Sequence, residues 1–228
     1  MDSQGGYSAI IDAPGHNLIN HPAAHTPQGR YSGDMNDPIG VVLAGGSGRR
    51  MGQDKAAVHF RGKPLIDHVA SALGSAGLEV VVVGRNQPLG AYSAVGDLPG
   101  LGAGPAVGLL SAFAHYPQRD IFLTAVDQPL LRPETIRGLL TLPGDAVVPV
   151  ADSHPQVTCA LYRAACRDVL EGMLNGGQAK LRGLLALIDP TMVGREAWLE
   201  WGEDGSSWLS LDTPDALRAA EAGAATGH

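Results

Sequence analysis

Ile39-Gly40-Val41-Val42-Leu43-Ala44-Gly45-Gly46 is the stretch that decides the fold. A short apolar run ends in two glycines, which is typical of a buried strand that runs into a loop. The pattern returns at residues 80–83, closed by Gly84, and at residues 121–126, which end at Asp127. Apolar runs without polar alternation indicate strands of a mostly parallel sheet that is covered on both faces.

Helical segments alternate with these strands. Apolar residues at helical spacing follow Pro64, which falls in the expected first turn, and Gly104-Pro105 opens a second helix. We also expect helices over residues 133–140 and 163–174, strands over 92–95, 146–150 and 157–161, and a last helix capped by Thr213. The sequence therefore predicts an α/β fold with helices on both sides of a mostly parallel sheet.

Composition favours one globular domain in a chain of 228 residues, of which 44% are hydrophobic. We expect a flexible N-terminal tail over residues 1–37, one domain over 38–224 and a short tail over 225–228. No apolar run approaches the roughly 20 residues that span a membrane, and no secretory signal precedes the domain. The two cysteines, Cys159 and Cys166, are too few for a disulfide framework and fit a core role in a reduced, cytoplasmic setting.

The net charge of -7 argues against a nucleic-acid partner. However, five of the sixteen basic residues fall within one short stretch, which suits a compact anionic ligand better than a long polyanion. These five residues are Arg49, Arg50, Lys55, Arg61 and Lys63.

The loop from Leu43 to Lys55 reads L-A-G-G-S-G-R-R-M-G-Q-D-K and follows the first predicted strand. Its glycines let main-chain amides approach phosphate oxygens, while Arg50 and Lys55 supply positive charge. The spacing matches neither the dinucleotide fingerprint nor the P-loop. Because open α/β folds bind ligands at the carboxyl ends of their strands, the loop predicts a phosphate site there.

These residues resemble a known family. L-A-G-G-x-x-x-R-M-G-x-D-K followed by G-K-P-L is the signature of the molybdenum cofactor guanylyltransferases, members of a wider nucleotidyltransferase family. Later motifs follow in the family's order over about residues 38–220. They are Asp97, Gly104-Pro105-Ala106-Val107-Gly108, Val126-Asp127-Gln128-Pro129, Lys180-Leu181-Arg182 and Leu211-Asp212-Thr213-Pro214. The resemblance implies a three-layer Rossmann-like nucleotidyltransferase fold.

The resemblance also implies an activity, namely Mg²⁺-dependent transfer of GMP from GTP to the terminal phosphate of molybdopterin, with release of pyrophosphate. Partners would be enzymes that insert molybdenum or accept the finished cofactor. The implied nucleotide-binding residues are Leu43, Ala44, Gly45, Gly46, Lys55, Asp97 and Asp127. Catalysis would fall to Arg50, Lys55 and Asp127, metal binding to Asp127 and Asp212, and pterin binding to Arg182. Taken alone, these residues leave structural roles open, as turn residues, helix caps or solvated side chains.

Three alternatives to guanylyl transfer stay open. Asp212 and the Asp127-Gln128-Pro129 string look more like the related molybdopterin cytidylyltransferases, but those usually carry L-A-A-G, so that Gly45 favours guanine. A sugar-phosphate nucleotidyltransferase is the second alternative. A non-catalytic partner that only holds nucleotide or cofactor is the third, and the presence of both Lys55 and Asp127 argues against it.

Overall fold

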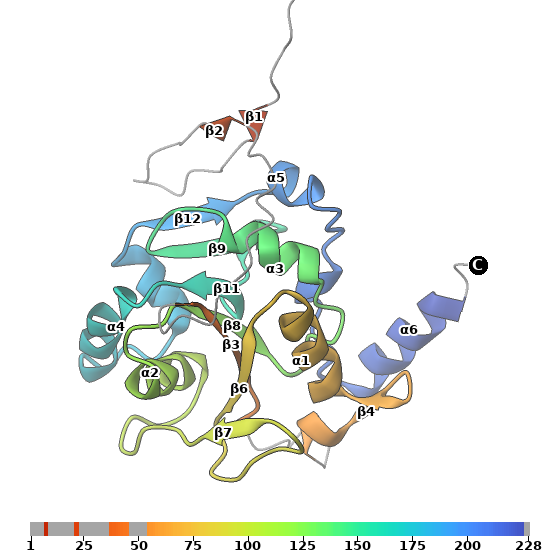
Figure 1. Ribbon diagram of the computed structural model, residues 1–228, viewed down its shortest axis with the longest axis horizontal. Coiled ribbons are helices and arrows are strands. Elements are labelled where there is room, and N and C mark those ends of the chain that lie inside the picture. Colours follow the sequence, from red (N-terminus) through yellow and green to blue (C-terminus); the bar gives the residue numbers. More distant parts are fainter. Residues whose placement is uncertain (1–6, 9–20, 23–36, 46–53, 226–228) are drawn as a thin grey trace, which may run out of the picture.

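The computed structural model describes residues 7–8, 21–22, 37–45 and 54–225. Its centre is an eight-stranded sheet with helices on both faces (Figure 1). The strands lie in the order β10-β9-β11-β8-β3-β6-β7, and β12 also pairs with β9. Their bounds are β3 Ile39–Leu43, β6 Glu79–Val83, β7 Ser93–Val95, β8 Ile121–Ala125, β9 Ala146–Ala151, β10 His154–Pro155, β11 Cys159–Tyr162 and β12 Pro190–Val193.

One half of the sheet is wholly parallel. Strand β3 lies between β6 and β8 and runs parallel to both, and β6 is parallel to β7. Successive side chains point to opposite faces of the sheet. Val42 and Val82 therefore belong to one hydrophobic cluster, and Val41 and Val81 belong to the other. Burial on both faces explains why these strands are apolar throughout.

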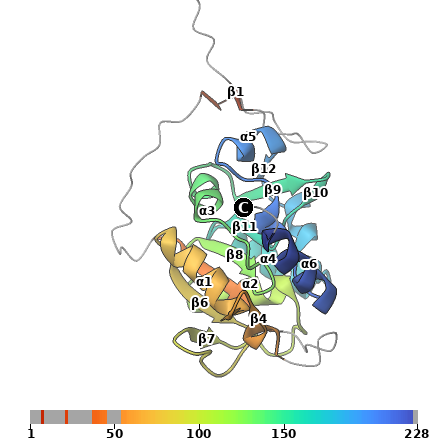
Figure 2. The same cartoon turned by 90° about the vertical axis from the view of Figure 1, so that its right-hand side faces the viewer.

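The helices form the two outer layers. On one face lie α1 (Leu65–Ser75), α3 (Pro133–Leu140) and α5 (Arg195–Leu199), and on the other lie α2 (Pro105–His115) and α4 (Cys166–Asn175) (Figure 1). Figure 2 shows α1, α3 and the C-terminal helix α6 (Pro214–Ala225) from their own side of the molecule. The predicted three-layer α/β fold with a mostly parallel sheet is confirmed.

The first helix begins one residue later than the sequence predicts. Pro64 has an extended conformation with ψ at 144° and precedes α1 instead of lying in its first turn. It belongs to β5 (Lys63–Pro64), which pairs with β4 (His59–Phe60) in a hairpin. The main-chain N–H of Leu65 donates to Val58 O at 2.8 Å, and this bond holds the hairpin against the start of the helix.

The other half of the sheet is mixed. Strand β11 runs antiparallel to both β8 and β9, and β12 runs parallel to β9. A tight turn joins β9 to β10 through Asp152 and Ser153, whose φ angles are 49° and 62°, as two-residue hairpin turns require. Both cysteines are buried in the core as predicted, and burial raises the pKa of each thiol.

The C-terminal segment crosses the molecule and ends beside the β4–β5 hairpin. The predicted cap of α6 is confirmed, because Thr213 Oγ1 accepts from the N–H of Ala216 at 3.1 Å. Near its other end, Glu221 accepts from the N–H of Arg61 at 3.2 Å. Three short 3-10 helices complete the described chain, namely η1 (Lys55–Ala57), η2 (Leu181–Ala186) and η3 (Ser206–Trp208).

Before β3, the described residues form one short antiparallel pair, β1 (Tyr7–Ser8) with β2 (His21–Pro22). The division into a tail over residues 1–37, a domain over 38–224 and a C-terminal tail stays a prediction. Within the described ranges, the structure contains no helix long and apolar enough to cross a membrane. The cytoplasmic setting also stays a prediction.

Candidate functional site

The carboxyl ends of four parallel strands meet at one edge of the sheet, and polar or glycine residues follow each of them. Strand β3 leads to Ala44-Gly45, β6 to Gly84-Arg85, β7 to Asp97 and β8 to Asp127. Ligands of open α/β folds bind outside this edge. The structure thus brings together residues that are spread over more than eighty positions of the sequence.

An ion pair joins the predicted phosphate-binding lysine to the predicted metal-binding aspartate. Lys55 Nζ lies 2.7 Å from Asp127 Oδ2, and the two side chains are 29% and 16% exposed. Lys55 is the first residue of η1, and Asp54 caps this helix by accepting from the N–H of Ala56 at 3.1 Å. An ammonium group and a carboxylate are therefore fixed side by side at the end of β8, within reach of solvent.

A buried glutamine holds the turn that carries Asp127. Gln128 is 3% exposed. Its Oε1 accepts from Thr124 Oγ1 at 3.1 Å and from the N–H of Ala125 at 3.0 Å. Because both donors belong to β8, the direction in which the chain leaves this strand is fixed.

Arg85 contacts both the beginning of the predicted nucleotide loop, at Ala44, and its end, at Asp54. Its Nε donates to Ala44 O at 3.2 Å, and its guanidinium forms an ion pair with Asp54. This hydrogen-bonded guanidinium lowers the pKa of the Asp54 carboxyl. Residues 46–53 fall between these two contacts, so Arg85 sets the distance between the chain that enters this segment and the chain that leaves it. Sequence reasoning missed Arg85, although a basic residue directly after the second strand was a usable signal.

Close backbone packing explains two glycines of the site. A Cβ on Gly45 would lie 2.8 Å from the Cα of Gly84, and a Cβ on Gly84 would lie 2.4 Å from the Cα of Gly45. Gly84 also has a φ of 93°, which side chains disfavour. The two strand ends therefore approach each other more closely than any residue with a side chain permits.

Asp97 lies at the far end of this row, in the loop between β7 and α2. It is exposed, yet partial burial raises the pKa of its carboxyl. Strands β6 and β3 lie between β7 and β8, so the axes of β7 and β8 are about 14 Å apart by three strand spacings of roughly 4.8 Å each. Asp97 and Asp127 follow these two strands and are therefore placed to contact different parts of one extended ligand.

The C-terminal segment brings Asp212 to the end of β8. The N–H of Leu211 donates to the main-chain oxygen of Asp127 at 2.7 Å, and Asp212 follows directly. Thr213 then caps α6, so that the chain is held on both sides of Asp212. Within the described ranges, three or more His, Cys, Asp or Glu residues nowhere gather as a metal site would need.

Arg182 belongs to η2, which packs against α4 on the face of the sheet that α2 and α4 cover. Strand β11 runs away from the carboxyl edge of β8, and α4 and η2 follow it in the chain. Arg182 is the second residue of η2, and it is exposed. The predictions for Gly46 and Arg50 fall outside the described residues, and all the assigned site roles stay predictions.

Comparison with known proteins agrees with this arrangement. The model of the MobA-like NTP transferase domain matches residues 40–192. A Bacillus licheniformis protein named probable molybdenum cofactor guanylyltransferase is 35% identical over 175 residues, which cover 70% of this chain and 88% of that protein. A Xanthomonas euvesicatoria molybdenum cofactor guanylyltransferase is 36% identical over 150 residues, covering 65% and 76% of the two chains.

Solved structures extend the likeness to three dimensions. The crystal structure of molybdopterin-guanine dinucleotide biosynthesis protein A from Archaeoglobus fulgidus has a TM-score of 0.71 at 26% identity, covering 82% of this chain and 98% of that chain. A Thermus thermophilus 2-C-methyl-D-erythritol 4-phosphate cytidylyltransferase, at 16% identity and a TM-score of 0.61, covers 83% and 100% and shares the fold alone. The family model and the sequence relatives agree with a site at the carboxyl ends of the strands. The chain therefore belongs to the MobA-like NTP transferase family and is a nucleotidyltransferase.

Proposed function

We propose that this enzyme transfers GMP from GTP to the terminal phosphate of the molybdenum cofactor, with Mg²⁺ as the cofactor and pyrophosphate as the second product. The Lys55–Asp127 pair at the carboxyl edge of the parallel strands carries the proposal. It joins a cation suited to phosphate oxygens with a carboxylate suited to a hard metal ion. The names of the relatives support guanine as the base and the molybdenum cofactor as the acceptor.

The oxygen ligands at the end of β8 fit Mg²⁺. This ion usually keeps several waters and binds through one or two carboxylates together with substrate phosphates. Asp127 and Asp212 would supply those carboxylates, because the N–H of Leu211 donates to the main-chain oxygen of Asp127 and Asp212 follows directly. Bound there, Mg²⁺ would add positive charge opposite the phosphates during the reaction.

The chain's own residues would act by positioning and by charge. An oxygen of the acceptor phosphate attacks the α-phosphorus of GTP, the bond from this phosphorus to the bridging β-phosphate oxygen breaks, and pyrophosphate leaves. Lys55 would donate to phosphate oxygens as their negative charge develops. No protein nucleophile takes part, so the site needs no activated Ser or Cys.

The two substrates would occupy different parts of the edge. The ends of β3, β6 and β7 would hold the nucleotide, because Ala44, Gly45 and Asp97 lie there. Arg182, on η2, would bind the phosphate of the pterin. The acceptor would then approach the α-phosphate from the side of β8 that faces β11.

Pyrophosphate release tests the proposal directly. Purified protein is supplied with GTP or CTP, Mg²⁺ and molybdenum cofactor, and each component is omitted in turn. We expect release with GTP that requires both the metal and the pterin. Release with CTP alone would replace guanylyl by cytidylyl transfer, and release with a sugar phosphate in place of the pterin would replace the acceptor. Nucleotide binding without release under any of these conditions would contradict an enzymatic role.

A further inference from the structure

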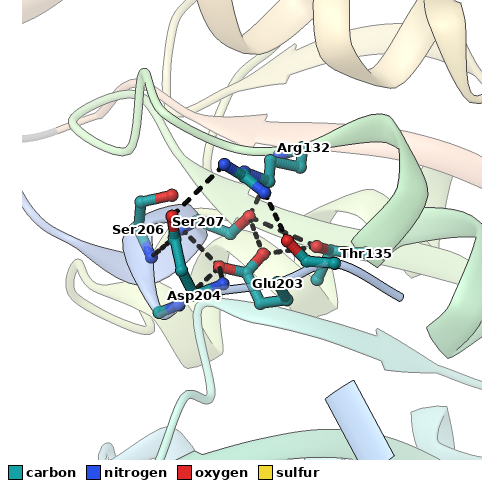
Figure 3. A network of polar contacts seen from close by, with 8 residues as sticks. Arg132, Thr135, Glu203, Asp204, Ser206 and Ser207 are labelled. Atoms are coloured by element: carbon teal, nitrogen blue, oxygen red, sulfur yellow. Dashed lines mark hydrogen bonds and ion pairs between the residues drawn. The ribbon is translucent and has the colours of Figure 1, made fainter. Parts of the chain in front are cut away.

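A buried carboxylate lies beneath the segment that leads to Asp212. Glu203 is 1% exposed. Its Oε1 accepts from the main-chain N–H groups of Asp204 at 3.0 Å, Gly205 at 2.7 Å and Ser207 at 3.3 Å. Its Oε2 accepts from the hydroxyls of Thr135 and Ser207 (Figure 3). One carboxylate oxygen is thus bonded to main-chain amides and the other to hydroxyls.

These bonds join two elements that are distant in the sequence. Thr135 belongs to the first turn of α3, whereas Ser207 belongs to η3. Arg132 strengthens the same junction, because its N–H donates to Ser207 Oγ at 3.0 Å and its guanidinium reaches Gly202 O and the Asp204 carboxylate (Figure 3). A carboxylate that loses water must regain its hydrogen bonds within the protein. The burial of Glu203 therefore favours only conformations in which the chain around η3 and the start of α3 keep these hydrogen bonds.

The same two chain segments meet again at the functional site. Helix α3 follows the turn of Asp127, and η3 leads into Leu211, whose N–H donates to Asp127 O at 2.7 Å. Between these two junctions, Trp208 is buried and its ring lies 5.2 Å from the ring of Trp198 in an edge-to-face contact. Residues 203–211 are thus fixed at both ends and in the middle, and Asp212 comes next.

We infer that Glu203 is a positioning residue that sets the register of the C-terminal segment against the end of β8 and thereby places Asp212 beside Asp127 for the metal that accompanies the nucleotide. Glu203 touches no reacting atom in this account and acts through Asp212. The inference deepens the proposed function and rests on it.

Direct metal binding tests the inference apart from turnover. Mn²⁺ is titrated in the presence of a non-hydrolysable GTP analogue, and bound Mn²⁺ is measured by electron paramagnetic resonance. We expect Asp212→Asn to weaken Mn²⁺ binding about tenfold and Glu203→Gln about threefold to tenfold, because the amide replaces one acceptor oxygen by a donor that faces two hydroxyls. In the Asp212→Asn background, Glu203→Gln should add less than about a twofold change, since both act through one ligand.

Two further variants keep the test informative if Glu203→Gln folds poorly. Thr135→Val removes one donor to Glu203 at nearly constant volume, and it should weaken Mn²⁺ binding about twofold to threefold in the same Asp212-dependent way. Asp120→Asn is the matched control. Asp120 also accepts two hydrogen bonds, from Arg163 at 2.7 Å and from the N–H of Ala164 at 2.9 Å, but it precedes β8 at the opposite edge. Its replacement should leave the Mn²⁺ affinity unchanged.

The outcomes separate this inference from the proposed function. If Mn²⁺ binding is weaker in Asp127→Asn but not in Glu203→Gln or Thr135→Val, the metal site is supported. The positioning role of Glu203 would then be overturned. An effect of Glu203→Gln that persists in full in the Asp212→Asn background would also overturn it. Wild-type protein that binds no Mn²⁺ together with the nucleotide analogue would contradict the proposed function itself.

Discussion

The two halves of the sheet's carboxyl edge are built differently. In the parallel half, formed by β8, β3, β6 and β7, the strand ends and η1 are held together by the Lys55–Asp127 pair, by Arg85 and by the Gly45–Gly84 contact. In the mixed half, formed by β11, β9, β10 and β12, the basic residue assigned to the site, Arg182, is exposed. If the proposed function holds, the difference teaches that residues around the reacting phosphates are held rigidly, whereas an exposed charge would bind the acceptor.

Replacement of Lys55 should give the largest effect. Lys55→Met removes a preorganised charge at the reacting phosphates, so we expect the kcat for pyrophosphate release to fall about 100- to 1,000-fold. Lys63→Met is the control, because Lys63 is an exposed basic residue of the nearby β4–β5 hairpin. A loss of less than about tenfold in Lys55→Met, with its fold intact by circular dichroism, would remove the lysine from the mechanism.

Gly45→Ala distinguishes packing from base recognition. The added methyl group would meet the backbone of Gly84, so we expect the variant to lose about 1–3 kcal/mol of stability in thermal or denaturant unfolding. Its activity with GTP should fall without any gain of activity with CTP. Gly74→Ala is the control, since a Cβ there meets nothing within 4 Å. New activity with CTP in Gly45→Ala would instead identify Gly45 as a determinant of base choice.

Replacement of Arg85 tests whether nucleotide binding depends on the contacts of Arg85 with Ala44 and Asp54. Arg85→Met removes the link between Ala44 and Asp54, and we expect the KM for GTP to rise about 10- to 30-fold while the KM for the pterin stays unchanged. Arg119→Met is a closely matched control. Arg119 Nε donates to Asp37 O at 2.7 Å and its guanidinium pairs with Glu79 at 2.5 Å, at the opposite edge of the sheet. Equal kinetic effects in both variants would reduce Arg85 to a contributor to stability.

Arg182 should give the smallest and most selective effect. In Arg182→Ala we expect the KM for the pterin substrate to rise about five- to tenfold, because exposed charge pairs contribute little, while the KM for GTP is retained. Arg218→Ala serves as the control, since Arg218 is 69% exposed on α6 and pairs only within its own helix among the described residues. If Arg182→Ala raised the KM for GTP instead, the division of the edge between two substrates would be wrong.

The parallel half was largely predictable from the sequence. Strand Ile39–Leu43 has the predicted bounds, and α2 begins at Pro105 as Gly104-Pro105 indicates. Apolar runs buried on both faces, ended by glycine or proline, give signals that are read within a few residues. The edge that carries the site follows directly from this strand pattern.

The mixed half was predicted less well, for local reasons. Strand β11 begins at Cys159 and not at Val157, because the N–H of Cys159 donates to Gln156 O at 2.9 Å and closes a turn. Helix α4 begins at Cys166 and not at Arg163, whose guanidinium is held by Asp120 at 2.7 Å. Strand β12 was not predicted, since a four-residue strand that starts with proline gives no periodic signal.

The contacts that fix the site were beyond prediction from one sequence. Glu203 and Thr135 are 68 positions apart, and Arg85 and Asp54 are 31 apart. Pairing at such separations depends on strand order and loop register, which local patterns do not encode. The family signature therefore indicated which residues matter, and the three-dimensional arrangement adds what holds them in place.

A crystal structure with Mn²⁺ and a non-hydrolysable GTP analogue tests the central claim most directly, because the anomalous signal of manganese locates the metal without interpretation of the protein density. We expect a manganese peak bound by the carboxylate of Asp127 and by phosphate oxygens of the nucleotide, whose base lies along the ends of β3, β6 and β7. A peak away from Asp127, or a nucleotide bound beside Arg182, would contradict this claim.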